Sequence, residues 1–546
     1  MVRIRPLFLA VCPPVVFALF GPPSVWADPS IQFDGSSPIG EGDAVPVARG
    51  LESLHGTPSG DVPQKGGATP SAAGGPFPGG ITTDQAVFLE DLMHREYQYF
   101  AEQCNKKTGL CLDHSNSDGS KASDDMANTA SIAATGFGLT AHCIASAPDH
   151  RWVDRASARR QVLATLTMLW NAKTKNGWYN HFLDADTADD VGVGKDAWDK
   201  GVISSVDTAL LLGGVLTVRQ CFKDDGDEGR EIYDLAGKIY DRVDFPWMLD
   251  GKDTFSMGWE PDPKSSDGSG KFMAARYNVY SEALLLNLLA VGSKTHPVDP
   301  SIWRKFARPE ANYNGVSYVQ GPSDLFTHHY PWGYFDVRGL VDSQGLDYEA
   351  NAKKAIQAQQ RWFKNEVASE FAPTFRQRGE ENPYMTRSAW GLTSSSCNNP
   401  PNNYCGWGGP PRPGRYDGTI VRSAPGGSLA VMPKESAESL MAMSGYLHDR
   451  FPDADLRYGL PDAIRPAGLP DTLRSGGPSA DGAKGWLSPT QLGINIGPDI
   501  IAWDNLKNGR VWQLFMDNPE ARIALDRVGF KRKSAVTRMV PPSPAP

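Results

Sequence analysis

The sequence predicts an all-α domain with large loops. Helical patterns recur along most of the chain, whereas convincing strand alternation is almost absent. Two kinds of helix alternate: TALLLGGVL (208–216) and EALLLNLLAV (282–291) are apolar on every face, whereas REIYDLAGKIYDRV (230–243) and NAKKAIQAQQRWF (351–363) are amphipathic. A toroid of paired helices, with an inner ring surrounded by an outer ring, would produce this alternation, and an ordinary helical bundle would produce part of it.

The first 27 residues have the pattern of a secretory signal peptide. Arg3 and Arg5 precede an apolar run, and Val25-Trp26-Ala27 is a cleavage sequence with small residues at both ends. Residues 28–82 are dominated by Gly, Pro, Ser and Ala and show no apolar period, so we expect a disordered linker there. No later run reaches the roughly 18 apolar residues that a membrane span needs. We therefore expect a protein that is secreted or periplasmic.

The folded domain is expected over residues 83–530, with a flexible C-terminal tail at 531–546. A capping box formed by Thr82 and Gln85 marks the start of the domain. Long loops inside a compact domain usually form the walls of an active site or are disordered, and the aromatic residues of these loops favour walls. Helices are expected near 84–103, 128–146, 155–171, 204–221, 229–243, 277–291, 348–368, 434–450 and 518–528.

The cysteines suit an oxidising compartment. Of the 7 cysteines, all but Cys12 follow the predicted signal peptide, which leaves an even number. Cys104–Cys111 and Cys397–Cys405 would each close a short loop, and Cys143–Cys221 would then be the long-range pair, although other pairings are open. The spacings typical of metal sites, CxxC, HxxxH and HExxH, do not occur. The sequence therefore implies no metal and no organic cofactor.

The charge of the chain argues against nucleic acid as a partner. The formal net charge is −9, with 54 basic and 63 acidic residues, and neither sign forms a long block. The 15 Trp, 17 Tyr and 22 Phe favour stacking on neutral, ring-shaped ligands, or the filling of a large core. We expect an oligo- or polysaccharide as the substrate, no nucleic acid, no membrane span and a monomer.

Glu282 stands at the start of an almost wholly apolar run. From Ala283 to Val291 only Asn287 is polar, so a helix here must be buried. Burial would raise the pKa of the Glu282 carboxyl, as a general acid that works near neutral pH requires. The alternative is that Glu282 only complements the positive end of its helix.

Two further carboxylates are candidates for the same site. Asp207 also lies near the start of a helix of the inner type, where Ser204 and Asp207 match a capping signature. If the inner helices run the same way, Asp207 and Glu282 meet at one end, and two carboxylates are the minimum for glycosidic hydrolysis. Asp417 lies in a polar, Gly-rich loop, although Asp-Gly is also a common turn dipeptide.

Aromatic and polar residues accompany these acids in the loops. Side chains of this kind bind sugar rings by stacking and hydrogen bonding. His181 is included as a substrate contact, although a structural hydrogen bond is the more common role. The candidate substrate-binding residues are Trp259, Tyr280, Trp332, Tyr334, Trp390, Tyr416 and His181.

Nine motifs in one order resemble the glycoamylase-like family, which includes the endo-β-1,2-glucanases of glycoside hydrolase family 144. They span most of the predicted domain, so the resemblance does not depend on any one of them. The motifs are ASIAATGFGLTA (130–141), GWYNHFLD (177–184), SSVDTALLLGGVL (204–216), YNVYSEALLLNLLAVGSKTHP (277–297), WGYFDVRGLVDSQGLDYEANAKKA (332–355), WGLT (390–393), YDGTIVRSAPGGSLAVMPKES (416–436), YGLPDA (458–463) and NIGPDII (495–501).

The resemblance implies an (α/α)6 toroid with a cleft at one end and hydrolysis of β-1,2-glucan with inversion. Glu282 resembles the general acid, Asp417 the carboxylate on the base side, and Asp207 a further acid of the cleft. An inverting pair of carboxylates is expected to lie about 6.5–9.5 Å apart. The chain departs from the family at Asn495, where an acid is common, and in the cysteine-closed loop 397–405. A glucosidase or lyase for another polysaccharide, or a carbohydrate-binding protein without catalysis, stay open as alternatives.

Overall fold

The computed structural model describes residues 77–533, except for residues 125, 192–200, 263–267, 323, 387, 398–402, 408–416 and 467–484. The predicted signal peptide, most of the predicted linker, all but the first residues of the predicted tail, and Tyr416 lie outside the described residues. The folded domain begins with a short 3-10 helix, η2 (Pro78–Gly80), and with the predicted capping box, in which Thr82 and Gln85 bond to each other's backbone.

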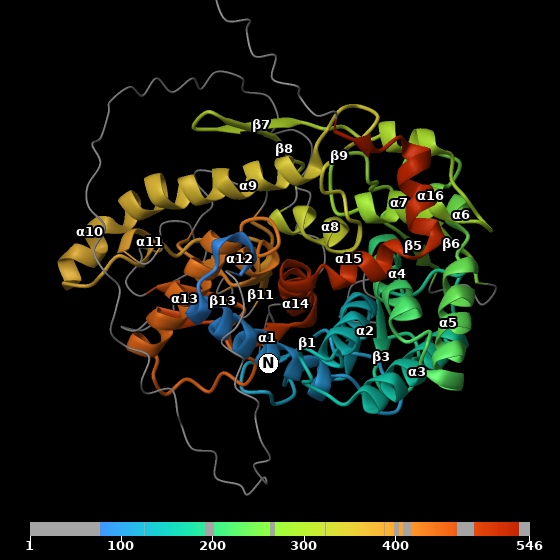
Figure 1. The fold of residues 1–546 in the computed structure, drawn as a ribbon, viewed down its shortest axis with the longest axis horizontal. Helices are drawn as coiled ribbons and strands as arrows, with labels where there is room; N and C mark the ends of the chain where they lie inside the picture. Colours follow the sequence, from blue (N-terminus) through green and yellow to red (C-terminus); the bar gives the residue numbers. More distant parts are fainter. Residues whose placement is uncertain are drawn as a thin grey trace, which may run out of the picture. The chain divides into compact units, whose positions relative to one another are not determined.

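Helices that are buried on almost every face form the inner ring of the fold (Figure 1). Contacts pass from α14 to α2, α4, α7 and α8 and back to α14, and α12 packs on α14. All nine residues of α7 are buried, as its apolar sequence predicts. The inner helices are α2 (Ile132–Ala145), α4 (Ser205–Cys221), α7 (Leu284–Gly292), α8 (Tyr330–Tyr334), α12 (Ser423–Gly427) and α14 (Gly493–Asn508).

Amphipathic helices pack around this ring. The helix α5 shows the pattern clearly, with Ile232, Ala236 and Ile239 buried and charged residues on the opposite face. The outer helices are α1 (Thr83–Gln103), α3 (Arg155–Asn171), α5 (Gly226–Asp241), α9 (Tyr348–Trp362), α13 (Pro433–Arg450) and α16 (Pro519–Val528). The shorter helices are α6 (Phe245–Leu249), η4 (Pro300–Arg304), η5 (Leu325–His328), the π-helix η6 (Phe363–Val367), α10 (Ala368–Arg378), α11 (Pro383–Thr386) and α15 (Arg510–Met516).

Two glycines allow α2 and α4 to lie in close contact. A Cβ atom at Gly214 would lie 1.9 Å from the carbonyl oxygen of Gly136, and one at Gly136 would lie 2.5 Å from the carbonyl oxygen of Leu210. Only a residue without a side chain fits at either position. The GxG and GG segments of these apolar helices therefore set how tightly the inner ring closes.

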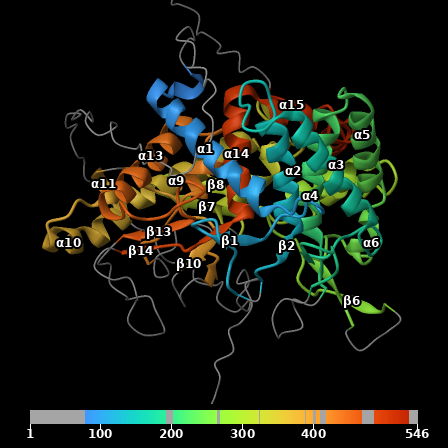
Figure 2. The ribbon, with the colours of Figure 1, turned by 90° about the horizontal axis from the view of Figure 1, so that it is seen from below.

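Short antiparallel strands, which the sequence did not predict, lie at the ends where inner helices begin. β2, β4, β12 and β15 lead directly into α2, α4, α12 and α14, and Figure 2 shows several of these strands along one side of the helices. The sheets are β1–β15, β2–β3, β4–β5–β6, β7–β8, β9–β16, β10–β11 and β12–β13–β14. The strands are β1 (His114–Asn116), β2 (Thr129–Ser131), β3 (Phe182–Asp184), β4 (Ile203–Ser204), β5 (Gly258–Pro261), β6 (Gly270–Phe272), β7 (Glu310–Tyr313), β8 (Val316–Val319), β9 (Leu340–Val341), β10 (Ser395–Cys397), β11 (Asn403–Cys405), β12 (Ile420–Val421), β13 (Ala463–Pro466), β14 (Gly485–Leu487), β15 (Thr490–Leu492) and β16 (Lys531–Arg532).

The helix boundaries differ from the prediction mainly near functional segments. The helix expected at 277–291 begins at Leu284, because the backbone N–H groups of Tyr277 and Tyr280 donate to Phe255 and Ala307 instead of forming a helical turn. The helix α14 was not predicted, since Pro498 interrupts its pattern. Pro498 lies inside the helix and cannot donate to the Ile494 carbonyl, which instead accepts from the Tyr330 hydroxyl at 3.5 Å. The three cysteine pairs are those expected: Cys104–Cys111, Cys143–Cys221 and Cys397–Cys405.

A buried ion cluster joins α12 to two other helices. The Arg422 side chain is 1% exposed, and its Nη1 donates to Glu96 on α1 and, at 2.9 Å, to Asp499 on α14. Burial raises the pKa of Glu96 to about 7 despite the opposing effect of Arg422. The cluster thus anchors the chain a few residues after Asp417.

Candidate active site

Glu282 lies in the turn that precedes α7. Its carbonyl oxygen accepts a hydrogen bond from Leu285, and the preceding residue, Ser281, accepts one from Leu284, so the chain turns into the helix at this point. The side chain therefore does not occupy the first turn of the helix. This position weakens the interpretation in which Glu282 serves only to complement the helix end.

The surroundings of the Glu282 carboxyl favour its protonated form. The residue is 6% exposed, and Oε2 has no hydrogen-bonding partner among the described residues. Burial raises the pKa of this carboxyl to about 7; the residue's own backbone N–H opposes the rise, and the charges of Asp207 and Asp324 add to it. A carboxyl of this kind can hold a proton and release it near neutral pH.

Asp207 combines the two roles that the sequence left open. It occupies the first turn of α4, where its backbone N–H donates to the Ser204 hydroxyl and its carboxylate accepts from the same hydroxyl. The other partner of the carboxylate is His181, whose Nε2 lies 3.5 Å from Oδ2. The charge of Asp207 also adds to the raised pKa of Glu282, so the residue both caps α4 and acts on the proposed acid.

Asp417 faces donors rather than apolar side chains. Its Oδ1 accepts hydrogen bonds from the Thr419 backbone, at 3.0 Å, and from the Thr419 hydroxyl, at 2.6 Å. The Arg465 guanidinium donates to the Asp417 carbonyl at 2.8 Å and lies 3.7 Å from Oδ2. Asp417 is 9% exposed. Asp417 thus accepts hydrogen bonds from neighbouring donors, in contrast to the Glu282 Oε2, which has no such partner among the described residues.

Asp324 is a carboxylate that the analysis of the sequence missed. It is fully buried just before η5, and its Oδ2 accepts from the Ser394 hydroxyl and, at 3.0 Å, from the Trp407 backbone. Its charge contributes to the raised pKa of Glu282. A lone Asp in a loop usually indicates a turn, and only the Pro-Ser-Asp sequence before an aromatic run distinguished it.

Three of the predicted sugar-binding aromatics are packing residues. Tyr280 and Tyr334 are fully buried, and their hydroxyls pair with His328 at 3.1 Å and with Thr140 at 3.4 Å. Trp390 is 4% exposed, and its indole N–H donates to the Glu435 carbonyl. Side chains enclosed in this way offer little surface for stacking on a sugar, and a substrate-binding role for Tyr280, Tyr334 and Trp390 stays a prediction.

Of the remaining predicted contacts, His181 is paired with one of the acids, Asp207. Its side chain is 17% exposed beside Asp207, and its ring stacks on Phe182 with centroids 3.8 Å apart. Trp259, on β5, is 7% exposed and lies beneath the Lys175 ammonium group. Trp332 is also mostly buried, and Tyr416 lies outside the described residues. We therefore retain His181 as the best placed of these residues.

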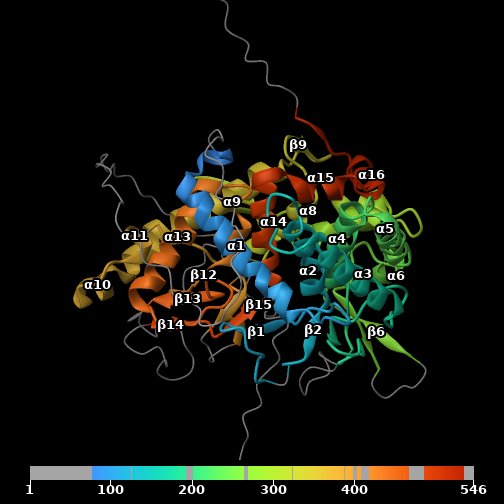
Figure 3. The same ribbon diagram turned by 60° about the horizontal axis from the view of Figure 1, so that its bottom comes forward.

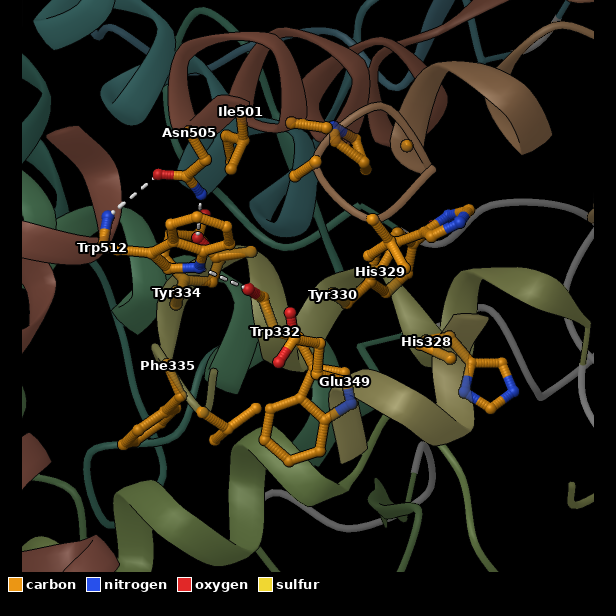
Figure 4. Close-up of a pocket in the computed structure, with 18 of the residues that line it drawn as sticks. His328, His329, Tyr330, Trp332, Tyr334, Phe335, Glu349, Ile501, Asn505 and Trp512 are labelled. Atoms are coloured by element: carbon orange, nitrogen blue, oxygen red, sulfur yellow. Dashed lines mark hydrogen bonds between the residues drawn. The ribbon is translucent and has the colours of Figure 1, made fainter. Parts of the chain in front are cut away.

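Residues of α8, α14 and α15 line an aromatic pocket (Figure 4). It is lined by Trp332, Phe335 and Trp512, and the Arg338 guanidinium lies 3.9 Å from the centre of the Trp512 ring. Tyr330 also lines the pocket, and burial, followed by Tyr404 and the charges of Glu282 and Asp207, raises the pKa of its phenol. The three candidate catalytic acids do not line the pocket.

One group among the described residues has side chains close enough together to hold a metal ion. It consists of Asp149, His150 and Asp504, on the outer side of α14. Arg510 lies 2.7 Å from Asp504, and the His150 Nδ1 lies 2.7 Å from Glu90. The group is therefore already an ion-pair network, and it does not include any candidate catalytic residue.

The double ring of helices, with short strands that lead into inner helices, defines the (α/α)6 class (Figure 3). Two solved structures share this fold. The endo-β-1,2-glucanase from Chitinophaga pinensis, in complex with sophorotriose and glucose, has a TM-score of 0.67 and 21% identity, over 83% of this chain and 99% of that one. The β-1,2-glucanase from Parabacteroides distasonis has a TM-score of 0.65 and 20% identity, over 82% of this chain and 60% of that one.

The family follows from the sequence comparison. Residues 275–519 match the glycoamylase family, described as "Putative glucoamylase". The resemblance that the motifs carry is therefore confirmed by a match to the family model over this segment. A curated relative, the exo-β-1,2-glucooligosaccharide sophorohydrolase (non-reducing end) of Parabacteroides distasonis, is 22% identical over 472 residues. The match covers 82% of this chain but only 58% of that relative.

Proposed function

We propose that this protein is an inverting glycoside hydrolase that cleaves β-1,2-glucan. The observation that carries the proposal is the contrast between two carboxyl groups. Glu282 is buried, and its pKa is raised to about 7, whereas Asp417 accepts two hydrogen bonds and faces a guanidinium. Carboxyl groups whose environments differ in this way are the usual basis for assigning an acid and a base.

In the proposed reaction, protonated Glu282 donates its proton to the glycosidic oxygen as the bond to the anomeric carbon breaks. Asp417 accepts a proton from the water molecule that attacks the anomeric carbon from the opposite face. The product is a new reducing end with inverted configuration, and the two carboxyl groups then exchange protons with solvent to restore the starting state. Asp207, held by Ser204 and beside His181, keeps negative charge near Glu282 and sustains its raised pKa.

The names of the related proteins support β-1,2-glucan as the substrate. One is an endo-β-1,2-glucanase, and another is a sophorohydrolase that acts on β-1,2-glucooligosaccharides. The three disulfides are compatible with the proposed secreted or periplasmic location. None of the helices in the described part is long and apolar enough to cross a membrane. We also propose a monomer, which size-exclusion chromatography with light scattering would test.

The decisive experiment measures the reducing ends released from linear β-1,2-glucan by the wild type and by Glu282→Gln. We expect hydrolysis by the wild type and a loss of roughly 10²- to 10⁴-fold in the variant, the contribution typical of general acid catalysis. β-1,3- and α-1,4-glucans in parallel test the linkage, and NMR of the first product tests inversion. If both proteins bind the glucan but neither cleaves it, the chain is a binding protein. Equal cleavage by both would disprove the assignment of Glu282.

A further inference from the structure

The hairpin β10–β11 is hydrogen-bonded to two buried carboxylates, Asp324 and Asp462. Its strands pair Ser395 with Cys405 and Cys397 with Asn403, and the Cys397–Cys405 disulfide joins them. The Trp407 indole N–H donates to the Ser395 hydroxyl at 3.3 Å, so the chain that leaves the hairpin folds back on it. The proposed function assigns no role to this segment, which the family resemblance marks as a local elaboration.

One side of the hairpin holds the segment that supports Glu282. The Ser394 hydroxyl and the Trp407 backbone N–H both donate to the Asp324 carboxylate. Asp324 leads directly into η5, whose last residue, His328, lies 3.1 Å from the Tyr280 hydroxyl. Tyr280 precedes Glu282 by two residues. Hydrogen bonds and a short helix thus connect the hairpin to the proposed acid.

The other side of the hairpin holds the segment that supports Asp417. The Ser396 backbone N–H donates to the Asp462 carboxylate at 2.8 Å. Asp462 leads into β13, whose Arg465 donates to the Asp417 carbonyl at 2.8 Å. Asn495 strengthens the junction, since its amide donates to Asp462 at 2.7 Å and to the Ser394 carbonyl at 3.1 Å.

The junction also explains why this chain has Asn rather than an acid at position 495. Asp462 is fully buried, and burial raises the pKa of its carboxyl. A second carboxylate at 495 would face Asp462 as a like charge, and it would lack the two N–H donors that now bridge Asp462 and the hairpin. Asn495 and the hairpin therefore belong to one hydrogen-bonded unit.

We propose that the disulfide-closed hairpin β10–β11 is a positioning element that fixes the place of the acid segment relative to the base segment. The inference rests on the proposed function of Glu282 and Asp417. Both carboxylates that the hairpin holds are fully buried, so neither can exchange its protein donors for water without a structural change. Loosening the hairpin would displace both catalytic segments together, and a displacement of about 1 Å can lower turnover by about 100-fold.

The test compares the wild type with Cys397→Ser/Cys405→Ser and with Ser394→Ala, each in the full chain. We expect kcat on β-1,2-glucan to fall by about 10- to 100-fold in the double variant, with a much smaller change in KM. Ser394→Ala removes the hydroxyl donor of Asp324. We expect the kcat of this variant to fall at a lower pH than the kcat of the wild type. It also serves as the test if the double variant does not fold.

The matched control is Cys104→Ser/Cys111→Ser, because that disulfide spans 7 residues where Cys397–Cys405 spans 8. Removal of either disulfide therefore changes the conformational entropy of the unfolded chain by a similar amount. The inference would be overturned if both hairpin variants kept the kcat and the pH profile of the wild type. It would also be overturned if kcat fell equally in the control variant.

Hydrogen exchange provides a measurement that does not depend on activity. In the Cys397→Ser/Cys405→Ser variant, we expect faster exchange both in the segment from Asp324 to His328 and in the segment from Asp417 to Val421. Faster exchange in the hairpin alone would overturn the inference. A wild type that cleaves no β-glucan would refute the proposed function instead, and the exchange result would still decide the role of the hairpin.

Discussion

Replacing Glu282 with Gln should raise the stability of the protein while it removes the activity. The pKa of this carboxyl is raised from 4.5 to about 7 in the folded state, and the side chain is only 6% exposed. Between these pH values the native protein retains a proton that the unfolded chain releases. Stability therefore decreases as the pH rises through this window, and the full cost is present above pH 7.

The size of the effect follows from the shift. Each pKa unit corresponds to about 1.4 kcal/mol, so Glu282 lowers the free energy of unfolding by about 3 kcal/mol at pH 8. Gln has nearly the same shape and carries no charge, so it avoids this cost. The unfolding entropy of a domain of roughly 450 residues is about 1 kcal/mol per degree, so the Tm of the variant should exceed that of the wild type by about 3 °C.

Thermal unfolding of both proteins at pH 4 and at pH 8 measures this difference. Below pH 4.5 the carboxyl is protonated in both states, so the two Tm values should coincide at pH 4. Glu231→Gln, on the exposed face of α5, is the control and should change Tm at neither pH. A Glu282→Gln variant that is no more stable than the wild type at pH 8 would refute the conclusion that burial disfavours the charged form of Glu282.

Other predictions concern residues around the proposed acid and base. Asp207→Asn removes a charge that helps raise the pKa of Glu282, so the loss of kcat at high pH should begin at a lower pH; an unchanged pH profile would exclude this coupling. Asp417→Asn keeps an acceptor for Thr419 but removes the base, so kcat should fall by roughly 10²- to 10⁴-fold. Calorimetry should show that substrate binding is retained. A near-normal kcat would disprove the role of Asp417 as the base. Arg422→Met leaves Glu96 and Asp499 buried without their cation, and urea unfolding should show a loss of about 3–5 kcal/mol, in contrast to a surface ion pair.

The local sequence was sufficient to predict most of the helices. The apolar runs of α4 and α7 identify inner helices, because a helix without a polar face must be buried. The alternation with amphipathic helices such as α5 indicated a double ring. The position of Glu282 ahead of an apolar run also predicted a carboxyl with a raised pKa, since burial has the same effect whatever the fold.

Aromatic residues show where the local sequence is insufficient. Tyr280 and Tyr334 are aromatic residues of the type that binds sugars, but helices distant in the sequence pack around both and enclose them. Exposure depends on what lies opposite a side chain, and Gly213 on α4, for example, lies against the Tyr334 ring. A residue type that serves equally in a core and in a sugar site cannot be assigned from its neighbours in the chain.

The sequence by itself indicated the helical class, the family resemblance and the candidate acid, because each depends on local pattern or on motifs, and it left the cysteine pairing open. Only the tertiary structure decided that α7 begins after Glu282, that the charge of Asp324 acts on Glu282, and that a hairpin joins the Glu282 and Asp417 segments. The physical reason is that these features depend on hydrogen bonds between residues far apart in the chain, such as those of Asp324 with Ser394 and of Asp462 with Ser396. Such bonds leave no periodic signal in the sequence, and the fold alone brings their partners together.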